Sequence, residues 1–486
     1  MTILSVTFFS ACTDDDSFGT NRSDILTFST DTVNMDTLFS TVPTSTYNFW
    51  VYNNSSDGIR LRKVRLQRGN QTGFRVNVDG EYLDNALGSQ VSGIEIRKGD
   101  SIRVFVELTS AMNNSDTPQL VEDNLLFNLE SGVEQSVCLR AYSWDALLCD
   151  TVVIKKDSVI SGNKPIVIRR GLSVDSGATL TINAPACLYF HDGAGIDVYG
   201  RLIVNKGNVG NDVVFRGDRT DRMFDYLPYD RVSGQWRGIR IHSSSSGNYI
   251  SNADIHSAEY GVVCDSAAYD QLTSRLTLEN VIIHNCKGTG VETNNSNVTI
   301  VNSQITNTLG DCVAIHGGSA LIVYCTIAQF YPFSADRGAA LRFTNFKGEY
   351  DYPLHALECY NTLVTGYAGD VVYGETKDTT VAFSYYFANS ILRTEKPDSN
   401  MINSGAYSNI IWETPKDTLQ GKGHFILIDE ENMYYNFKLD SMSTARGNAM
   451  PIGQYLTDRI GKERGDTPDI GCYQYVDPKR LIVFPR

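Results

Sequence analysis

The sequence predicts an all-β protein in which an N-terminal β-sandwich is followed by a parallel β-helix. The first third of the chain contains short runs of alternating polar and apolar residues, separated by turn signals, with little helical periodicity. A unit of two short strands around a Gly-containing turn then recurs along the chain, which is the pattern of a stacked repeat. The repeated runs lack the apolar spacing of a helical solenoid, so the stacked elements are expected to be strands.

Composition excludes several classes of protein. The chain has 486 residues, of which 42% are apolar, so it can bury a sizeable core and is not mostly disordered. No segment approaches the ~20 apolar residues that span a bilayer, which excludes a polytopic membrane protein. The 42 Lys and Arg residues against 56 Asp and Glu residues give a net charge of −14. Because such a field repels phosphate backbones, we expect no nucleic-acid partner.

The N-terminus is typical of an exported protein. Residues 1–12 form a short apolar stretch that ends in small residues and Cys12, as the tail of an export signal does. The segment Phe9–Cys12 resembles a bacterial lipobox, and the acidic residues that follow resemble the signal that sends lipoproteins of the Bacteroidetes group to the outer cell surface. The resemblance implies a lipid anchor on Cys12 in the outer membrane, facing the cell exterior. The alternative is that residues 13–23, here expected to be an acidic tether, are an ordinary linker of a soluble chain.

Residues 24–146 are expected to form the β-sandwich. Their strand-like runs recur at the spacing of a small antiparallel domain. These runs are Ile25–Phe28, Tyr47–Tyr52, Arg60–Leu66, Phe74–Val78, Ser101–Leu108, Asn124–Leu129 and Gln135–Tyr142. The order of Val51–Asn54, Leu61–Leu66 and Val137–Ala141 resembles Ig-like domains of the Hydin/choice-of-anchor type.

Residues 149–394 are expected to form the β-helix, because one aliphatic position recurs in six successive copies of the repeat. The copies contribute Ile255, Ile283, Ile305, Ile327, Leu363 and Ile391, separated by 28, 22, 22, 36 and 28 residues. A spacing near 22 residues corresponds to one coil, and longer gaps are coils with inserted loops. Alternate residues of a strand share a face, so this column should point inward and its neighbours outward.

A second column accompanies the aliphatic one. Asn252, Asn280 and Asn302 line up and are followed by Tyr324 and Tyr360. Side-chain amides in such a column can hydrogen-bond along the axis of a strand stack.

Two further segments carry a family resemblance. Gly177–Ile182 and Val198–Leu202 resemble the opening coils of right-handed, pectate-lyase-like parallel β-helix proteins. Near the C-terminus, Asp469–Gln474 resembles the closing module of secreted bacterial β-helix proteins, so residues 395–486 are expected to form the last coils and the capping module. These resemblances imply an architecture and transfer no catalytic residue.

The ten cysteines are scattered and show no disulfide framework. Several lie in apolar runs, as around Cys264 and Cys325, and free cysteine behaves there as a small buried hydrophobe. The sequence has no Cys-x-x-Cys motif and no His pair at ligand spacing, so we expect neither a metal site nor a cofactor.

The outward columns offer weak candidates for catalysis. β-Helix proteins of the resembled family include polysaccharide lyases and hydrolases, which act at charged clusters on one face of the coils. One outward face offers Asp265, Glu292, Asn294, His316 and Arg342, and another offers Asp254, His256 and His284. His316 near Arg342 has the residue types for acid–base work. The alternative is an ordinary solvated β-face, on which such residues are common.

Long insertions offer candidates for binding, because aromatic rings stack on sugars and arginines bind hydroxyl and carboxylate groups. The candidates are Arg219, Arg222, Tyr226, Tyr229, Arg231, Trp236, Tyr331, Phe333 and Arg337, and a further insertion spans Phe343–Tyr352. The alternative is that these loops fold back and cover the flank of the solenoid with their own aromatics.

Three functional hypotheses follow. The leading one is an outer-membrane surface lipoprotein that acts as a non-catalytic binding or scaffolding module for a glycan or an outer-membrane protein. The second is a β-helix polysaccharide lyase or glycoside hydrolase that uses the face of His316 and Arg342. The third is an accessory subunit of an outer-membrane protein complex.

Overall fold

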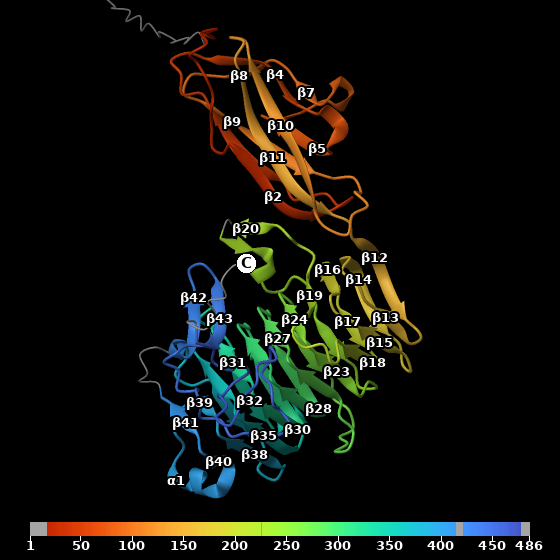
Figure 1. Ribbon diagram of the computed structural model, residues 1–486, viewed down its shortest axis with the longest axis vertical. Coiled ribbons are helices and arrows are strands. Elements are labelled where there is room, and N and C mark those ends of the chain that lie inside the picture. Colours follow the sequence, from red (N-terminus) through yellow and green to blue (C-terminus); the bar gives the residue numbers. More distant parts are fainter. Residues whose placement is uncertain (1–16, 225, 415–420, 478–486) are drawn as a thin grey trace, which may run out of the picture. The chain divides into compact units, whose positions relative to one another are not determined.

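The computed structural model describes residues 17–224, 226–414 and 421–477, and within them the protein is all-β (Figure 1). The chain divides into two compact units, residues 1–145 and 146–486, each with its own hydrophobic core. The export signal, Cys12 and the first residues of the tether lie outside the described residues. In the described part of the chain, no helix has the length and apolar character needed to cross a membrane.

The first unit is a β-sandwich of two sheets. One sheet has the order β1 (Thr27–Phe28), β3 (Tyr47–Tyr52), β9 (Ser101–Leu108), β5 (Phe74–Val78) and β6 (Glu81–Tyr82). The other has the order β2 (Thr32–Phe39), β11 (Glu134–Trp144), β10 (Gln119–Leu129), β4 (Ile59–Leu66) and β7 (Gln90–Val91), and β8 (Ile94–Ile96) also pairs with β4. Two 3₁₀ turns, η1 (Gly69–Gln71) and η2 (Asn85–Leu87), connect strands.

Alternate residues from both sheets build the core of this unit, as the period of two requires. Phe49 and Phe127, one from each sheet, meet edge to face with their ring centroids 6.5 Å apart. Strand β2 was not among the expected strands, and it pairs parallel to β11. The alternation of buried and exposed residues in β2 is interrupted at Asp36, whose φ of +53° accompanies a register shift in the pairing of β2 with β11.

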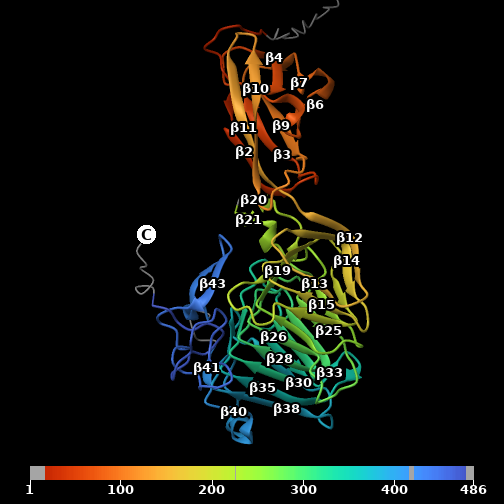
Figure 2. The ribbon, with the colours of Figure 1, turned by 45° about the vertical axis from the view of Figure 1, so that its right-hand side comes forward.

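The second unit is a parallel β-helix whose strands belong to one 26-stranded sheet (Figures 1 and 2). Residue pairing sorts the strands into three parallel stacks, and each coil contributes to each stack in turn. Four long strands turn a corner and serve two stacks. These are β12 (Leu147–Ile154), β14 (Ile166–Val174), β28 (Val291–Val301) and β30 (Val313–Val323).

Stack 1 begins with the first halves of β12 and β14 and continues through nine strands. They are β16 (Cys187–Phe190), β19 (Val213–Gly217), β24 (Ala253–His256), β27 (Ile282–His284), β29 (Gln304–Thr306), β31 (Thr326–Gln329), β36 (Leu363–Gly366), β39 (Ile391–Arg393) and β41 (Ile411–Glu413). The last strand of this stack therefore lies within residues 395–486, the segment expected to contain the last coils.

Stack 2 uses the second halves of β12 and β14 and the first halves of β28 and β30. Its other strands are β17 (Ile196–Val198), β22 (Ile239–Ile241), β25 (Val262–Cys264), β32 (Leu341–Thr344) and β37 (Val372–Glu375).

Stack 3 uses the second halves of β28 and β30. Its other strands are β13 (Ser158–Ile160), β15 (Thr179–Ile182), β18 (Arg201–Val204), β23 (Asn248–Ser251), β26 (Leu276–Glu279), β35 (Leu354–Tyr360), β38 (Phe383–Ala388) and β40 (Tyr407–Ser408). Two short helical segments, α1 (Ser399–Met401) and the π-helical η4 (Ile402–Ala406), precede β40.

The predicted aliphatic column is confirmed for four coils and wrong by one residue for the last two. Ile255, Ile283, Ile305 and Ile327 pair in register and are fully buried in the interior. The next partner of Ile327 is Val364, whereas Leu363 pairs with Thr326 and faces outward. A slip of one residue reverses the face of every side chain in a strand. Leu363 and Ile391 are nevertheless buried, because a second core covers this outer face.

The predicted alignment is off by one residue because it did not align the left-handed residue at the turn from stack 3 to stack 1. Seven residues occupy this position with φ between +45° and +57°: Asn252, Asn280, Asn302, Tyr324, Asn361, Asn389 and Asn409. Asn361, and not the expected Tyr360, is therefore the counterpart of Tyr324. Asparagine tolerates this conformation better than most residues do, which accounts for its recurrence. The predicted amide ladder is wrong for the column of Asn252, Asn280 and Asn302, because the side-chain oxygens of Asn252 and Asn280 are buried without a hydrogen-bond partner and Asn302 bonds to Thr457 and Arg464. An amide bond along the axis is present further along, from Asn409 to Asn389 at 2.8 Å.

The C-terminal module covers the outer face of stack 1 with a second hydrophobic core (Figures 1 and 2). It contains a 3₁₀ turn, η5 (Lys422–His424), and a hairpin of β42 (Phe425–Asp429) and β43 (Tyr434–Leu439), followed by irregular chain. Cys472 donates its backbone N–H to the Thr326 hydroxyl at 3.1 Å, and Tyr473 donates its hydroxyl to Gln304 at 2.9 Å. Polar residues expected in solvent on this face are therefore buried.

Candidate functional site

The outer face of stack 2 gathers charged side chains from successive coils. Residue pairing aligns one outward column as Asp197, Arg240, Val263, Glu292, Ala314, Arg342 and Tyr373. Two residues further along each strand, a second column contains His242, Asp265, Asn294, His316, Thr344 and Glu375. The structure thus brings together the predicted candidates Asp265, Glu292, His316 and Arg342 on one face. The residues between the columns point inward and anchor the face to the core.

Ion pairs connect neighbouring coils at the N-terminal end of this face. Arg240 contacts Asp265 at 2.9 Å, and His242 contacts Asp197 at 2.9 Å and Asp265 at 3.5 Å. Arg237 also contacts Asp197. Each carboxylate therefore has a cationic or imidazole partner from another coil.

Glu292 is the most enclosed acid of the face. Its cation comes from an insertion whose hairpin, β33 (Phe346–Lys347) and β34 (Tyr350–Asp351), brings the Lys347 ammonium onto the Glu292 carboxylate. Asn294 donates a further hydrogen bond to the same oxygen at 3.2 Å. Burial opposes ionisation of Glu292, but the hydrogen bond and charge of Lys347 outweigh it and hold the pKa of Glu292 below its usual value.

His316 and Arg342 do not form an acid–base pair. His316 contacts the Thr344 hydroxyl through Nδ1 at 2.9 Å, and burial lowers the pKa of this imidazole although Glu292 opposes the shift. Arg342 instead binds Asp311 at 2.7 Å and Glu375 at 3.0 Å. Arg342 therefore ties carboxylates of neighbouring coils together.

A hollow of about 350 Å³ opens on this face. Its charged lining is balanced, with three cationic and three acidic side chains: Arg237, Arg240, Lys347, Glu259, Asp265 and Glu292. The Tyr260 ring lies against Gly288, where an added Cβ would come within 2.3 Å of the ring, and 39% of Tyr260 remains exposed at the hollow. Gly238 lies in the floor, and its φ of +102° together with the nearby Tyr260 carbonyl leaves no room for a side chain.

The insertion at residues 216–231 folds back on stack 1, as the alternative interpretation holds. Arg219 forms an ion pair with Asp221 and lies over the Tyr229 ring at 3.5 Å. Arg231 donates to the Asn432 carbonyl at 3.2 Å and lies over the Tyr434 ring. The insertion also contains β20 (Arg222–Phe224), β21 (Leu227–Pro228) and η3 (Tyr229–Arg231). Arg222 and Tyr226 are exposed, and the Tyr226 ring stacks on Phe224.

Two predicted binding residues are structural. Trp236 is 1% exposed, stacks on Phe190 at 4.5 Å and donates its indole N–H to the His256 carbonyl at 2.8 Å. Tyr331 is also buried and shares a hydrogen bond with Ser233 at 2.9 Å. A ligand cannot reach these rings, so the prediction of a binding role is wrong for both.

Phe333 and Arg337, the other two binding candidates of the insertion at residues 330–337, differ in exposure. Phe333 is exposed and packs edge-on against Tyr331. Arg337 donates to the Tyr331 carbonyl at 2.6 Å and lies over the Tyr367 ring. Arg337 and Arg342 line a second hollow of about 380 Å³.

Several residues of the stack 2 face were missed from the sequence. Arg240 could have been found, because it lies two residues before His242 on the same strand face. Tyr260 and Arg237 lie in the turns that flank β22 and β25, where the alternation of the strands gives no guide. Lys347 reaches Glu292 from an inserted hairpin, and its position depends on how that hairpin folds.

The carboxyl groups of the protein share one electrostatic property. Among the described residues, each Asp or Glu whose pKa departs clearly from its ordinary value is shifted downward, because hydrogen bonds or neighbouring cations favour the charged form. These residues are Asp230, Asp254, Asp270, Glu292, Asp378, Asp429 and Glu430. A general acid for glycosidic cleavage needs a carboxyl group with a raised pKa.

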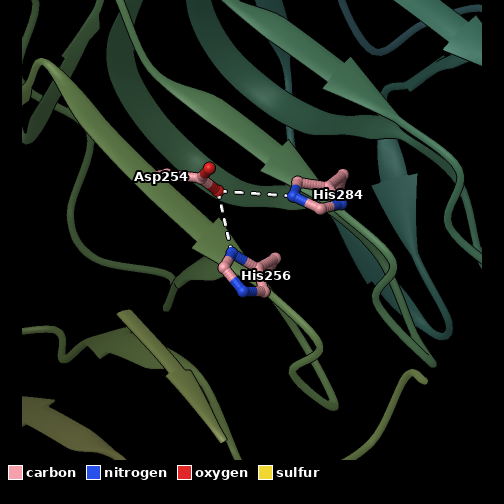
Figure 3. A group of neighbouring side chains, drawn as sticks. All are labelled: Asp254, His256 and His284. Atoms are coloured by element: carbon pink, nitrogen blue, oxygen red, sulfur yellow. Dashed lines mark hydrogen bonds and ion pairs between the residues drawn. The ribbon is translucent and has the colours of Figure 1, made fainter. Parts of the chain in front are cut away.

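A second cluster lies on the outer face of stack 1. Asp254 and His256 project from β24 and His284 from β27, and Figure 3 shows the Asp254 carboxylate between the two imidazoles. His256 Nδ1 lies 2.9 Å and His284 Nε2 lies 3.3 Å from Asp254 Oδ1. Among the described residues, these three side chains bring one oxygen and two nitrogen atoms of metal-ligand type within 4.8 Å of one another.

Comparison with known proteins supports the architecture. A family model described as right handed beta helix region matches residues 147–329. No curated protein matches the chain.

Similar solved structures include three glycoside hydrolases. They are a family 123 enzyme from Clostridium perfringens (9% identity, 25% of each chain, TM-score 0.18), a family 28 exopolygalacturonase from Yersinia enterocolitica (10% identity, 76% of this chain and 91% of that one, TM-score 0.19) and the catalytic unit of a GH87 α-1,3-glucanase from Streptomyces thermodiastaticus (10% identity, 76% and 89%, TM-score 0.20). The present chain spans a quarter of the length of the first of these.

Proposed function

We propose that the right-handed β-helix binds a neutral glycan in the stack 2 hollow and does not cleave it. The observation that carries the proposal is the lining of this hollow, where a half-exposed tyrosine ring lies among three cationic and three acidic side chains. The ring of Tyr260 offers an apolar face to a sugar ring. The surrounding cations and carboxylates offer donors and acceptors to its hydroxyl groups.

The charge balance of the hollow favours a neutral ligand. A sugar hydroxyl can donate to the Asp265 or Glu292 carboxylate and accept from the Arg240 guanidinium at the same time. An acidic glycan would bring an uncompensated negative charge to a hollow whose three cations already face three carboxylates. Uronate-rich glycans are therefore expected to bind more weakly than neutral ones.

That the glycan is not cleaved is proposed from the hydrogen bonds of Glu292 and Asp265 and from the lowered pKa of Glu292. Glu292 and Asp265 both accept hydrogen bonds from cations, and the pKa of Glu292 is lowered by Lys347 although burial opposes this. With its pKa lowered, Glu292 does not protonate a leaving group at neutral pH. The face is therefore proposed as a recognition surface.

The proposal also includes a location at the outer membrane, facing the cell exterior. It rests on the lipobox-like Phe9–Cys12 and the acidic residues that follow it. In a bacterial host of the Bacteroidetes group, the wild-type protein is expected in the outer-membrane fraction and the Cys12→Ser variant in the soluble fraction. Equal partition of the two proteins would refute this location.

Affinity electrophoresis in gels that contain soluble polysaccharides tests the glycan proposal. Neutral glucans, mannans and xylans form one set of gels, and polygalacturonate and alginate form the other. We expect retardation by at least one neutral glycan. Tyr260→Ala should weaken it about tenfold, or ~1.4 kcal/mol, because the stacking face is lost. Tyr82→Ala removes a 57% exposed tyrosine of the sandwich and should change nothing.

Three outcomes would overturn the proposal. The first is no retardation by any neutral glycan, or retardation that Tyr260→Ala leaves intact. The second is release of sugar products that Glu292→Gln abolishes, which would establish the lyase or hydrolase alternative. The third is stoichiometric recovery of an outer-membrane protein from detergent extracts by a chain that binds no glycan, which would establish the accessory-subunit alternative.

A further inference from the structure

The Asp254, His256 and His284 cluster lies on a different face from the proposed glycan site and is independent of it. His256 and His284 are register partners on adjacent coils, and their rings stack 4.8 Å apart. Asp254 precedes His256 by two residues and so shares its outward face. The repeat of the β-helix therefore places two imidazoles and one carboxylate together, although the two histidines are 28 residues apart.

From this arrangement we propose that Asp254, His256 Nδ1 and His284 Nε2 bind a divalent transition-metal ion, with zinc as the reference ion. Figure 3 shows the Asp254 oxygen facing one nitrogen of each imidazole. All three ligand atoms lie within 4.8 Å of one another. Ligand bonds of ~2.0–2.1 Å at tetrahedral angles place ligand atoms about 3.3 Å apart. The 3.3 Å from Asp254 Oδ1 to His284 Nε2 matches that spacing, whereas the 2.9 Å to His256 Nδ1 is a hydrogen-bond distance that would lengthen slightly when a metal ion replaces the shared proton.

The second ring nitrogen of His256 supports the proposal. Its Nε2 lies 2.8 Å from Asp230 Oδ1, and Arg216 contacts the same oxygen at 2.8 Å. Histidines that bind metals usually donate their other N–H to a carboxylate, which fixes the ring and its tautomer. Asp230 therefore orients His256 with Nδ1 toward Asp254.

The donor set specifies the class of metal. Two imidazoles and one carboxylate suit zinc and its neighbours among the transition metals, whereas Ca²⁺ and Mg²⁺ prefer oxygen ligands. Three protein ligands leave at least one coordination position for an exchangeable group.

The open position faces a cavity. Asp254 and His284 line a hollow of about 290 Å³ whose other walls include Arg231 and the β42–β43 hairpin residues Tyr434 and Lys438. His256 is 6% exposed and lies behind its partners, so ions and small ligands reach the site through this hollow. The cluster is thus enclosed on the protein side and accessible on the other.

Zinc and cobalt titrations of the full-length, tag-free protein after treatment with a chelator test the proposal. We expect one zinc ion per chain by calorimetry, and visible absorption bands of low-symmetry Co²⁺ that zinc abolishes. The variants His284→Gln and Asp254→Asn should lose this binding. Asp230→Asn should weaken it by 10–100-fold, because it removes the orienting partner of His256.

The matched control is His191→Gln. His191 also pairs with an aspartate, Asp218, at 2.8 Å on stack 1, but it is exposed and has no second imidazole beside it. This variant should bind zinc like the wild type. His284 is partly exposed, so His284→Gln is the variant of choice if replacement of the buried His256 prevents folding. Absence of zinc and cobalt binding in the wild type would overturn the proposal, as would binding that His284→Gln leaves unchanged.

Discussion

At the scale of single residues, Glu292 shows how the β-helix places an acid on its face without leaving it unpaired. Only 15% of its side chain is exposed, so burial alone would favour the neutral form. Lys347 outweighs that effect and lowers the pKa of Glu292. A carboxyl group with a lowered pKa in the folded state stabilises the fold above the pKa of the unfolded chain. This contribution is lost as the pH falls through the folded-state pKa.

The variant Lys347→Met tests this balance. At pH 7 the variant leaves a buried carboxylate without its cation, and we expect its melting temperature to fall by about 2 °C, for a loss on the order of 1 kcal/mol. As the pH falls toward 3.5, Glu292 of the variant is protonated first, because it lacks the cation that lowers its pKa, so the buried charge is removed and the difference from the wild type should shrink. Thermal melts followed by circular dichroism at pH 7 and pH 3.5 measure both differences.

A similar lysine provides the control for that experiment. Lys377 contacts Glu349 at 3.3 Å, but Glu349 is 96% exposed. Lys377→Met should therefore leave the melting temperature unchanged at both pH values. A Lys347→Met deficit that is equally large at pH 3.5 would show that the residue acts through packing and not through the charge of Glu292.

At the scale of the elements, the left-handed column at the turn from stack 3 to stack 1 sets the register of each coil. Asn280 has a φ of +57°, and its backbone N–H donates to the Val301 carbonyl of the next coil at 3.0 Å. Its side-chain oxygen is buried without a hydrogen-bond partner. The residue is therefore used for its backbone conformation.

Substitutions at Asn280 separate the contribution of its backbone conformation from that of its side-chain amide. Asn280→Gly should leave stability nearly unchanged, because glycine adopts positive φ freely and the unpaired oxygen is removed. Asn280→Ala should be less stable than Asn280→Gly by about 1–2 kcal/mol, the cost of the left-handed conformation for a residue with a Cβ. Urea denaturation of the three proteins measures the difference. Equal stability of the Gly and Ala variants would contradict the assigned role.

The register also shows what the sequence can and cannot predict about this fold. Alternation and coil spacing correctly align Ile255, Ile283, Ile305 and Ile327, because coils of near-equal length present the same slots. After the insertion that precedes β35, the predicted alignment placed Tyr360 opposite Tyr324 in place of the adjacent Asn361, and it was therefore wrong by one position. Adjacent residues of similar pattern cannot be distinguished by alternation when the loop between two coils is long.

The candidate site was predictable only in part for a related reason. Glu292, Asp265 and His316 lie at regular outward positions, so strand alternation places them on one face. Lys347 depends on an inserted hairpin. Asp254, His256 and His284 were placed on one outward face, but their ability to bind a metal was not predicted, because metal motifs are usually sought over a few residues and here the coil length separates the ligands. The burial of Gln304 was also missed, since it requires the docked C-terminal module.

At the scale of the whole molecule, the two units have separate cores and share no core cluster among the described residues. Independent cores are expected to unfold in separate transitions. Leu61 belongs to the core of the sandwich and Ile283 to that of the β-helix, and both side chains are fully buried. Each can therefore report on one unit.

Differential scanning calorimetry of Leu61→Ala and Ile283→Ala tests this independence. Truncation of a buried Leu or Ile costs ~2–5 kcal/mol, so each variant should lower one transition by several degrees. The other transition should stay at its wild-type temperature, and the double variant should show both shifts. A single transition that moves in both variants would show that the units unfold together.

The docking of the last segment onto early coils affects how the chain reaches its final form. Arg459 binds Asp212 at 2.8 Å and Arg464 binds Asn302 at 2.8 Å, contacts that join residues made at very different times during synthesis. The ribosome must therefore have synthesised residues 459–464 before the C-terminal module can cover the flank of the solenoid. A chain truncated before this C-terminal segment would expose the apolar side chains of Leu363 and Ile391 to solvent, where they favour aggregation. Cellular quality control could recognise that surface as the mark of an unfinished molecule.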